Sequence, residues 1–276
     1  MTEGTAAYVR WNGTLATGTR LWAVAGDELR RLRTNSWGFF VVAAGLTWGI
    51  ASAVQLYQFR NAGDAHNLDA FVAMMNQLLW FVLAAAAVIG APSILDDARR
   101  GALELYMARP LTRWEYLGGK AVALLGLCMS MFAGSILIYT VAAYGFFDQQ
   151  PDGWTWAPLA GLAFGALWSL LAVGAALGIS CVARSGRAAA ILLFGGAVVA
   201  HVTAGTVLPQ LTESSWLSIF SPFNAMAGLT PWLWPNATLV ASDFPPWWGL
   251  TEILVLAAVG WALVAWRHPR VRGEDS

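Results

Sequence analysis

The strongest constraint on this chain is a set of six apolar runs. Each reaches the ~20 residues that an α-helix needs to cross a bilayer. Tryptophan and tyrosine, which settle at the lipid–water boundary, border many of them. Of the 276 residues, 58% are hydrophobic and only 12% are charged, whereas soluble domains carry ~25% charge. We therefore predict an all-α polytopic membrane protein with six transmembrane helices. The spans are approximately Trp37–Tyr57, Phe71–Ala91, Ala121–Tyr144, Trp156–Val182, Ala188–Leu208 and Trp247–Trp266.

The distribution of Lys and Arg predicts the orientation of these spans. Fifteen of the 16 basic residues fall on the side that holds both termini, and Arg60 alone falls on the other. Short loops rich in Lys and Arg stay in the cytoplasm. Both termini are therefore expected to be cytoplasmic, in a multi-pass protein of the cytoplasmic (inner) membrane of a prokaryote. Residues 1–20 lack the apolar core of a secretory signal, and we expect them to be flexible.

Residues 21–276 are predicted to form one transmembrane domain with two elements that do not span. In Leu21–Thr34 the apolar residues share one helical face, which predicts an amphipathic helix in the inner interface. The alternative is an ordinary extension of the first span. Before the last span, Trp216–Leu233 is apolar but interrupted by Pro222 and Pro231. This pattern favours a re-entrant or interfacial hairpin on the outer side, and a pair of short extra spans is the alternative.

The segment Ser93–Lys120 places nine charged residues among 28 positions between the second and third spans. Such a segment must emerge into water. Pro92 should end or kink the second span. Ser93 and Asp96 fit a capping box that would open a helix of about 14 residues, ending near Arg109 and Pro110.

A second capping box, Thr112 with Glu115, should begin the third span at Arg113. The short helix would then be held between two membrane helices at both ends, as a docking element. The alternative is a solvated loop helix that touches only lipid headgroups. The acidic residues of the segment count against that alternative, because the inner leaflet is anionic.

The same segment resembles the intracellular signature of type-2 ABC exporter permeases. The resemblance lies in Asp97, in the run RGALEL at 100–105, in ARPLTR at 108–113, and in Tyr116 and Lys120. The spacing Glu104, Arg109-Pro110, Arg113 is its most specific part. One departure is Gly101-Ala102, where the family usually has Gly-Thr. The six spans, the N-terminal helix and the outer hairpin agree with the family over the whole chain.

This resemblance implies a function and a set of contact residues. The chain would be the membrane-spanning permease subunit of an ATP-driven ABC exporter. It would pair with a second permease copy, as a homodimer or heterodimer, and bind a separate ATPase subunit through a cytoplasmic coupling helix. The residues implied at that contact are Asp96, Asp97, Arg100, Gly101, Glu104, Arg109, Pro110 and Arg113.

The sequence itself offers no catalytic chemistry. It contains no Gly-x-x-x-x-Gly-Lys-Ser/Thr loop, so ATP and Mg would bind to the partner ATPase and no cofactor is expected on this chain. The three histidines and two cysteines are scattered, which predicts neither a metal site nor a catalytic residue. A net charge of zero gives no reason to expect nucleic-acid binding, whereas membrane lipid is an expected partner.

Polar residues inside the spans are candidates for a translocation pathway. They are Asn76, Gln77, His201, Thr203 and Glu252. For His201 the alternative is a packing role with a hydrogen bond to a neighbouring carbonyl, and for Glu252 it is solvation at headgroup level. Glycines at 161, 165, 174, 178, 195 and 196 are expected to permit close helix packing.

Two other functional classes stay open from the sequence. A membrane assembly or maturation factor, or an intramembrane enzyme using His201, could share this topology. An ion-coupled secondary transporter would favour inverted repeats and buried carboxylate pairs, and neither pattern is visible in the chain.

Overall fold

The computed structural model describes residues 17–34, 36–58, 66–99, 101, 112–146, 154–213, 215–237 and 244–266. Every regular element among these residues is a helix, which confirms the predicted fold class. In chain order they are α1 (Thr17–Thr34), α2 (Ser36–Gln58), α3 (His66–Ala85), η2 (Ala86–Gly90), α4 (Ala91–Arg99), α6 (Arg113–Phe146), α7 (Ala157–Val182), α8 (Gly186–Val202), η3 (Thr203–Val207), α9 (Leu208–Thr212), η4 (Ser215–Phe220), α10 (Pro222–Ala227), α11 (Thr230–Leu233) and α12 (Pro246–Trp266).

Six helical stretches are long and apolar enough to cross a membrane, as predicted. The second, third and fifth are longer than the apolar runs because polar and charged residues at their ends remain helical. The predicted hairpin folds as the short helices η4, α10 and α11, and none of them is long enough to span. The six stretches are Gly38–Tyr57, Leu68–Arg99, Trp114–Phe146, Ala157–Val182, Gly186–Thr212 and Pro246–Trp266.

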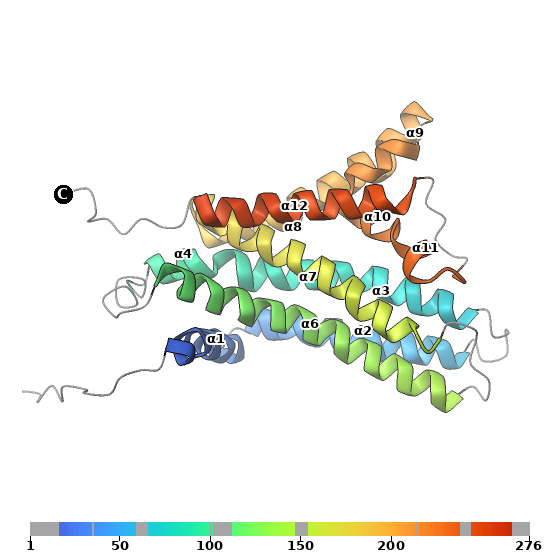
Figure 1. The fold of residues 1–276 in the computed structure, drawn as a ribbon, viewed down its shortest axis with the longest axis horizontal. Coiled ribbons are helices and arrows are strands. Elements are labelled where there is room, and N and C mark those ends of the chain that lie inside the picture. Colours follow the sequence, from blue (N-terminus) through green and yellow to red (C-terminus); the bar gives the residue numbers. More distant parts are fainter. Residues whose placement is uncertain are drawn as a thin grey trace, which may run out of the picture.

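The spans run side by side, and the two ends of the bundle differ (Figure 1). The helix α1, the end of α4 and the last turn of α12 lie at one end, which we call the basic end because Arg30, Arg31, Arg99, Arg184 and Arg187 belong to it. At the opposite end, the far end, α9 projects away from the bundle, and α10 and α11 lie beside the start of α12.

The second and fourth spans form the centre of the bundle, and the fifth lies at its edge. Within their most apolar windows, 67% of the second span and 61% of the fourth are buried, against 11% of the fifth. The Trp168 indole donates a hydrogen bond to the Leu79 carbonyl, 2.9 Å away, and so joins the two central spans. The fifth span therefore has most of its surface available to lipid or to another chain.

Glycines let the fourth span approach its neighbours closely, as predicted. A Cβ atom at Gly178 would lie 2.7 Å from the carbonyl oxygen of Gly260, and one at Gly165 would lie 2.6 Å from the Phe132 ring. These contacts are too short for any side chain, so α7 packs on α12 and α6 through bare backbone. Gly196 of the fifth span makes no such close contact, since a Cβ atom there would meet no atom within 4 Å.

The predicted helix start at Ser93 is wrong. The second span continues without a break from α3 through the π-helical turn η2 into α4, so Ser93 lies inside a helix and caps nothing. In a regular α-helix Pro92 would clash with the carbonyl four residues earlier. The π-helical turn directly before it widens the helix, and the Ala91 amide donates to the Ala86 carbonyl instead. The second span therefore accommodates Pro92 within a continuous helix.

The predicted 14-residue helix is also interrupted. The α4 helix ends at Arg99, and Gly101 has a φ of 68°, a left-handed conformation that commonly follows a helix end. Asp96 and Asp97 therefore lie in the last turns of a long helix and not in the first turn of a new one. The second capping box is confirmed: the Thr112 amide donates to the Glu115 carboxylate at 2.7 Å, and the Glu115 amide donates to the Thr112 hydroxyl at 3.2 Å.

The N-terminal helix α1 crosses α6 and does not extend the first span. The first span packs along α6 with Gly45 against Met131 and Gly49 against Ser135. These contacts run in parallel, so a straight extension of α2 toward the N-terminus would place α1 beyond the first residue of α6. Instead, its residues at 21–28 contact α6 at 118–120.

Candidate functional site

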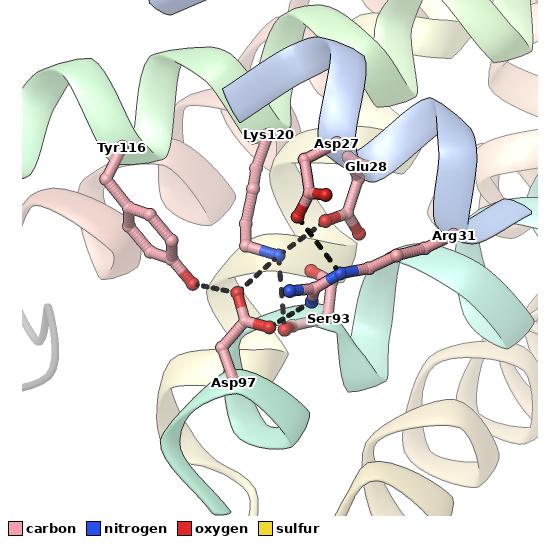
Figure 2. A network of polar contacts seen from close by, with 7 residues as sticks. All are labelled: Asp27, Glu28, Arg31, Ser93, Asp97, Tyr116 and Lys120. Atoms are coloured by element: carbon pink, nitrogen blue, oxygen red, sulfur yellow. Dashed lines mark hydrogen bonds and ion pairs between the residues drawn. The ribbon is translucent and has the colours of Figure 1, made fainter. Parts of the chain in front are cut away.

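A buried lysine lies where α1, α4 and α6 meet. Lys120 of α6 is 1% exposed, and its ammonium group has three acceptors within reach. These are Glu28 Oε2 at 2.8 Å, Asp97 Oδ2 at 2.9 Å and the Ser93 carbonyl at 3.2 Å. An ammonium group has three donor hydrogens, so this set uses all of them. One side chain of α6 thus holds both α1 and α4 (Figure 2).

Asp97 completes the connection among the three helices. Its side chain is 1% exposed, and its Oδ2 also accepts a hydrogen bond from the Tyr116 hydroxyl at 2.7 Å. Its Oδ1 accepts from Arg31 Nη1, and the Nε of the same arginine pairs with Asp27 at 3.3 Å. We call these residues the polar hub: Asp27, Glu28, Arg31, Ser93, Asp97, Tyr116 and Lys120, all drawn in Figure 2.

Helical spacing explains how the chain builds the polar hub. Tyr116 and Lys120 are four residues apart on α6, and Ser93 and Asp97 are four apart on α4, so each pair shares one face. Close approach of α1 requires Gly119, where a Cβ atom would lie 2.6 Å from Cβ of Val24 and 2.9 Å from the Leu21 carbonyl oxygen. The glycine and the i, i+4 pairs together bring the charges within bonding distance.

Adjacent acids of α4 face different neighbours. Asp97 points to α1 and α6, whereas Oδ1 of Asp96 lies only 3.4 Å from where a Cβ of Gly186 would be, at the start of α8. Beside it, Arg99 Nη2 donates to the Arg184 carbonyl at 3.1 Å, in the turn between α7 and α8. The end of the second span therefore contacts helices on both of its sides, at the basic end of the bundle.

The sequence-predicted coupling residues fall into two groups. Asp96, Asp97 and Gly101 lie at the end of the second span, and Arg113 begins α6. The other four lie outside the described residues: Arg100, Glu104, Arg109 and Pro110. We expected Asp97 to face a partner, and the structure instead directs its carboxylate into the chain's own polar hub.

Sequence reasoning missed most of the polar hub. The amphipathic pattern of Leu21–Thr34 predicts Trp22 on the apolar face and Glu28 on the polar face, yet Glu28 is 7% exposed while Trp22 is 67% exposed. One signal was available, because Lys120 is the only lysine of the chain and directly precedes the apolar run of the third span. A charge in that position requires a partner.

The five pathway candidates do not form one cluster. Asn76 and Thr203 donate to carbonyls of their own helices, those of Val72 at 2.9 Å and Val199 at 2.6 Å. His201 Nδ1 lies 2.8 Å from the Ser221 hydroxyl, so it joins the fifth span to the hairpin of η4, α10 and α11 rather than to a neighbouring carbonyl. Gln77 is exposed and Glu252 is half-buried. In the described parts of the chain, no group of three or more His, Cys, Asp or Glu side chains is placed to hold a metal ion.

Comparison with protein families identifies the family of the chain. The profile of the family described as ABC-2 family transporter protein matches residues 22–268, from α1 to just beyond the end of α12. No curated protein matches the chain significantly. The family match covers all six spans, the hairpin of η4, α10 and α11, and every residue of the polar hub. The chain therefore belongs to the ABC-2 family of transporter proteins and is a membrane permease of an ABC transporter.

Proposed function

We propose that this permease is the membrane subunit of an exporter and that a separate ATPase subunit drives it through the segment between α4 and α6. In this arrangement the basic end faces the cytoplasm with both termini, and α1 lies in the inner interface. ATP and Mg are bound by the ATPase subunit. Support comes from the family match and from the excess of Lys and Arg at the basic end.

The observation on which the proposal rests is the polar hub. The coupling segment leaves α4 two residues after Asp97 and enters α6 seven residues before Lys120. Both ends of the segment are therefore tied to each other and to α1 by buried ion pairs. A movement imposed on this segment is expected to displace the three helices together, because separating buried and fully hydrogen-bonded charges has a high free-energy cost.

This geometry divides the predicted coupling residues into two roles. Glu104 and its neighbours at 100–110 would touch the ATPase. Asp97 would transmit the movement, since its carboxylate is buried against its own chain. Asp96 and Arg99 would extend the same movement to the fifth span through Gly186 and Arg184.

A second permease copy is part of the proposal. The fifth span is the least buried of the six, and its Ile191 and Val199 side chains are 71% and 61% exposed. Gly196 on the same helix has open space around it. A glycine pair on an exposed membrane helix suits close approach of another helix. Polar residues on exposed faces, such as Gln77 and Thr203, would then line a pathway shared by two copies.

Copurification and ATP hydrolysis test the two roles separately. The tagged chain is extracted from its native membranes in mild detergent, and the ATPase that accompanies it is identified by labelling with a photoreactive ATP analogue. Glu104→Lys should abolish copurification. The Asp97→Asn protein that remains folded should still copurify with the ATPase, and the ATP turnover of that complex should change. Absence of any ATP-binding partner from the unmodified chain would refute the proposed function.

A further inference from the structure

The two sides of α4 differ in how their charges are balanced. On the side of the polar hub, Arg31 and Lys120 are both paired with acidic side chains. On the side of α8, three exposed arginines form no ion pair within the described part of the chain. We call them the arginine site: Arg99 at the end of α4, Arg184 in the turn between α7 and α8, and Arg187 in the first turn of α8.

We propose that the arginine site binds the phosphate of an anionic phospholipid at the membrane surface. The end of α4 and the turn between α7 and α8 both lie at the basic end of the bundle (Figure 1). A planar guanidinium group can donate two parallel hydrogen bonds to a phosphate, which suits arginine to this ligand. The inference does not depend on how the permease is driven or on the direction of transport.

A backbone contact gathers the positive charges. Arg99 Nη2 donates to the Arg184 carbonyl at 3.1 Å, so the cationic end of one arginine lies beside the backbone of another. Arg187 follows Arg184 by only three residues. Like charges gathered around one turn repel each other, and an anion bound among them offsets this repulsion. The contact therefore favours an anionic ligand.

The turn that carries the arginine site is fixed on α4. The Ser185 hydroxyl accepts a hydrogen bond from the Ala188 amide at 3.1 Å and so caps α8. Gly186 packs against the second span, since a Cβ atom there would lie 2.7 Å from Cβ of Pro92. The backbone that positions the arginines is thus ordered without a ligand, which lowers the entropic cost of binding one.

The position of the turn matches the level of lipid phosphates. Only three residues separate α7 from α8, and both helices belong to stretches able to cross a membrane. Val182 before the turn is 44% exposed and Ile191 after it is 71% exposed, so apolar surface lies close to the arginine site. A charged turn between two such helices is expected where the hydrocarbon meets the headgroups.

The net charge of this region favours an anionic lipid over a zwitterionic one. One acid lies close by: Asp96 Oδ1 is 3.4 Å from where a Cβ of Gly186 would be, and it forms no ion pair with the three arginines. Three positive charges and this one negative charge leave a net charge of +2. A zwitterionic phospholipid carries its own cation, whereas phosphatidylglycerol carries only the phosphate charge and complements the site better.

Lipid titration of the full chain tests the proposal. The protein is purified in mild detergent and freed of lipid, and phosphatidylglycerol is added while native mass spectrometry records the bound lipid. Two variants are compared, Arg184→Gln and Arg187→Gln, whose side chains form no hydrogen bond to other described residues. Each variant should bind its tightest lipid about tenfold more weakly, as expected for loss of a charge-assisted hydrogen bond.

The matched control is Arg30→Gln. Arg30 is also exposed, lies at the basic end and forms no ion pair with the described residues, but it belongs to α1. The control removes the same charge and should leave the affinity of the tightest lipid unchanged. Phosphatidylcholine and inorganic phosphate are titrated in parallel. Phosphatidylcholine should bind more weakly than phosphatidylglycerol, and inorganic phosphate should not displace the bound lipid.

Five results would contradict the inference. They are no phosphatidylglycerol retained by the unmodified chain, unchanged affinity in both arginine variants, an equal loss of affinity in Arg30→Gln, equal binding of phosphatidylcholine, and displacement of the lipid by inorganic phosphate. Thermal midpoints measured without lipid should be the same for all chains. If Arg187→Gln lowers the midpoint, Arg187→Lys replaces it, because lysine keeps the charge and lacks the planar pair of donors.

Discussion

Lys120 and Asp97 form an ion pair of 2.9 Å in which both side chains are 1% exposed. A charge so far from water is stable only when all its hydrogen-bonding groups have partners. Lys120 meets this condition with acceptors from two other helices. The pair therefore makes the packing of α1, α4 and α6 a single arrangement, in which removal of one member leaves the others buried without compensation.

Lys120→Met should destabilise the protein strongly. The substitution keeps most of the side-chain volume but leaves Glu28 and Asp97 without their shared cation, at a cost of about 3–5 kcal/mol. Thermal unfolding of the detergent-solubilised protein measures the loss. Addition of Glu28→Gln to the same chain should recover part of it, because one uncompensated charge disappears. Additive losses in the double variant would contradict the proposed coupling of the two residues.

Neighbouring aspartates should respond unequally to the same change. Asp97→Asn removes a buried carboxylate bonded to Arg31, Tyr116 and Lys120, and should cost several kcal/mol. Asp96→Asn alters only a half-buried group near the start of α8, with an expected cost of about 1 kcal/mol or less. Thermal midpoints of the two variants, measured side by side, should differ clearly. Equal midpoints would show that the polar hub contributes nothing to folding.

Gly119→Ala should displace α1. The added methyl group would lie 2.6 Å from Cβ of Val24, a distance that requires backbone movement, and overpacking of this kind costs about 1–3 kcal/mol. Faster proteolysis of the N-terminal helix measures the displacement. Gly126→Ala is the matched control on the same helix, because a Cβ atom there meets nothing within 4 Å. The idea fails if both variants are cleaved at the rate of the unmodified protein.

Substitutions of glycines in the fourth and fifth spans should distinguish effects on folding from effects on dimer assembly. Gly178→Leu should unfold the chain, since even a Cβ atom would lie 2.7 Å from the Gly260 carbonyl oxygen. Gly196→Leu has open space within one chain and should leave the thermal midpoint of a monomer unchanged. If a second copy packs on this face, Gly196→Leu should lower the fraction of dimer measured by chemical crosslinking and light scattering. An unchanged dimer fraction would place the second copy elsewhere.

Local patterns predicted the parts of this molecule that depend on local chemistry. The six spans follow from run length, and the start of α6 follows from the reciprocal bonds of Thr112 and Glu115. The close packing at Gly165 and Gly178 was predictable because glycine in a membrane helix commonly marks a close contact with a neighbouring helix. These features need no knowledge of what lies across the bundle.

Features that depend on distant contacts were not predictable in this way. The Ser93 cap fits the capping pattern, but η2 absorbs Pro92 and keeps the helix intact. The direction of Asp97 depends on Lys120 and on Arg31, which is 66 residues away in the chain. Burial of Glu28 in place of Trp22 follows from where α1 crosses α6, and the pattern of α1 alone does not encode that crossing.

The position of Lys120 also sets an order of events during synthesis. Its partner Glu28 precedes it by 92 residues, with two complete spans between them. The N-terminal helix is therefore translated long before the cation that fixes it exists. Until α6 is synthesised, Glu28 has no Lys120 to pair with and α1 lacks this tie to the bundle, so the complete docking of α1 follows the insertion of the third span.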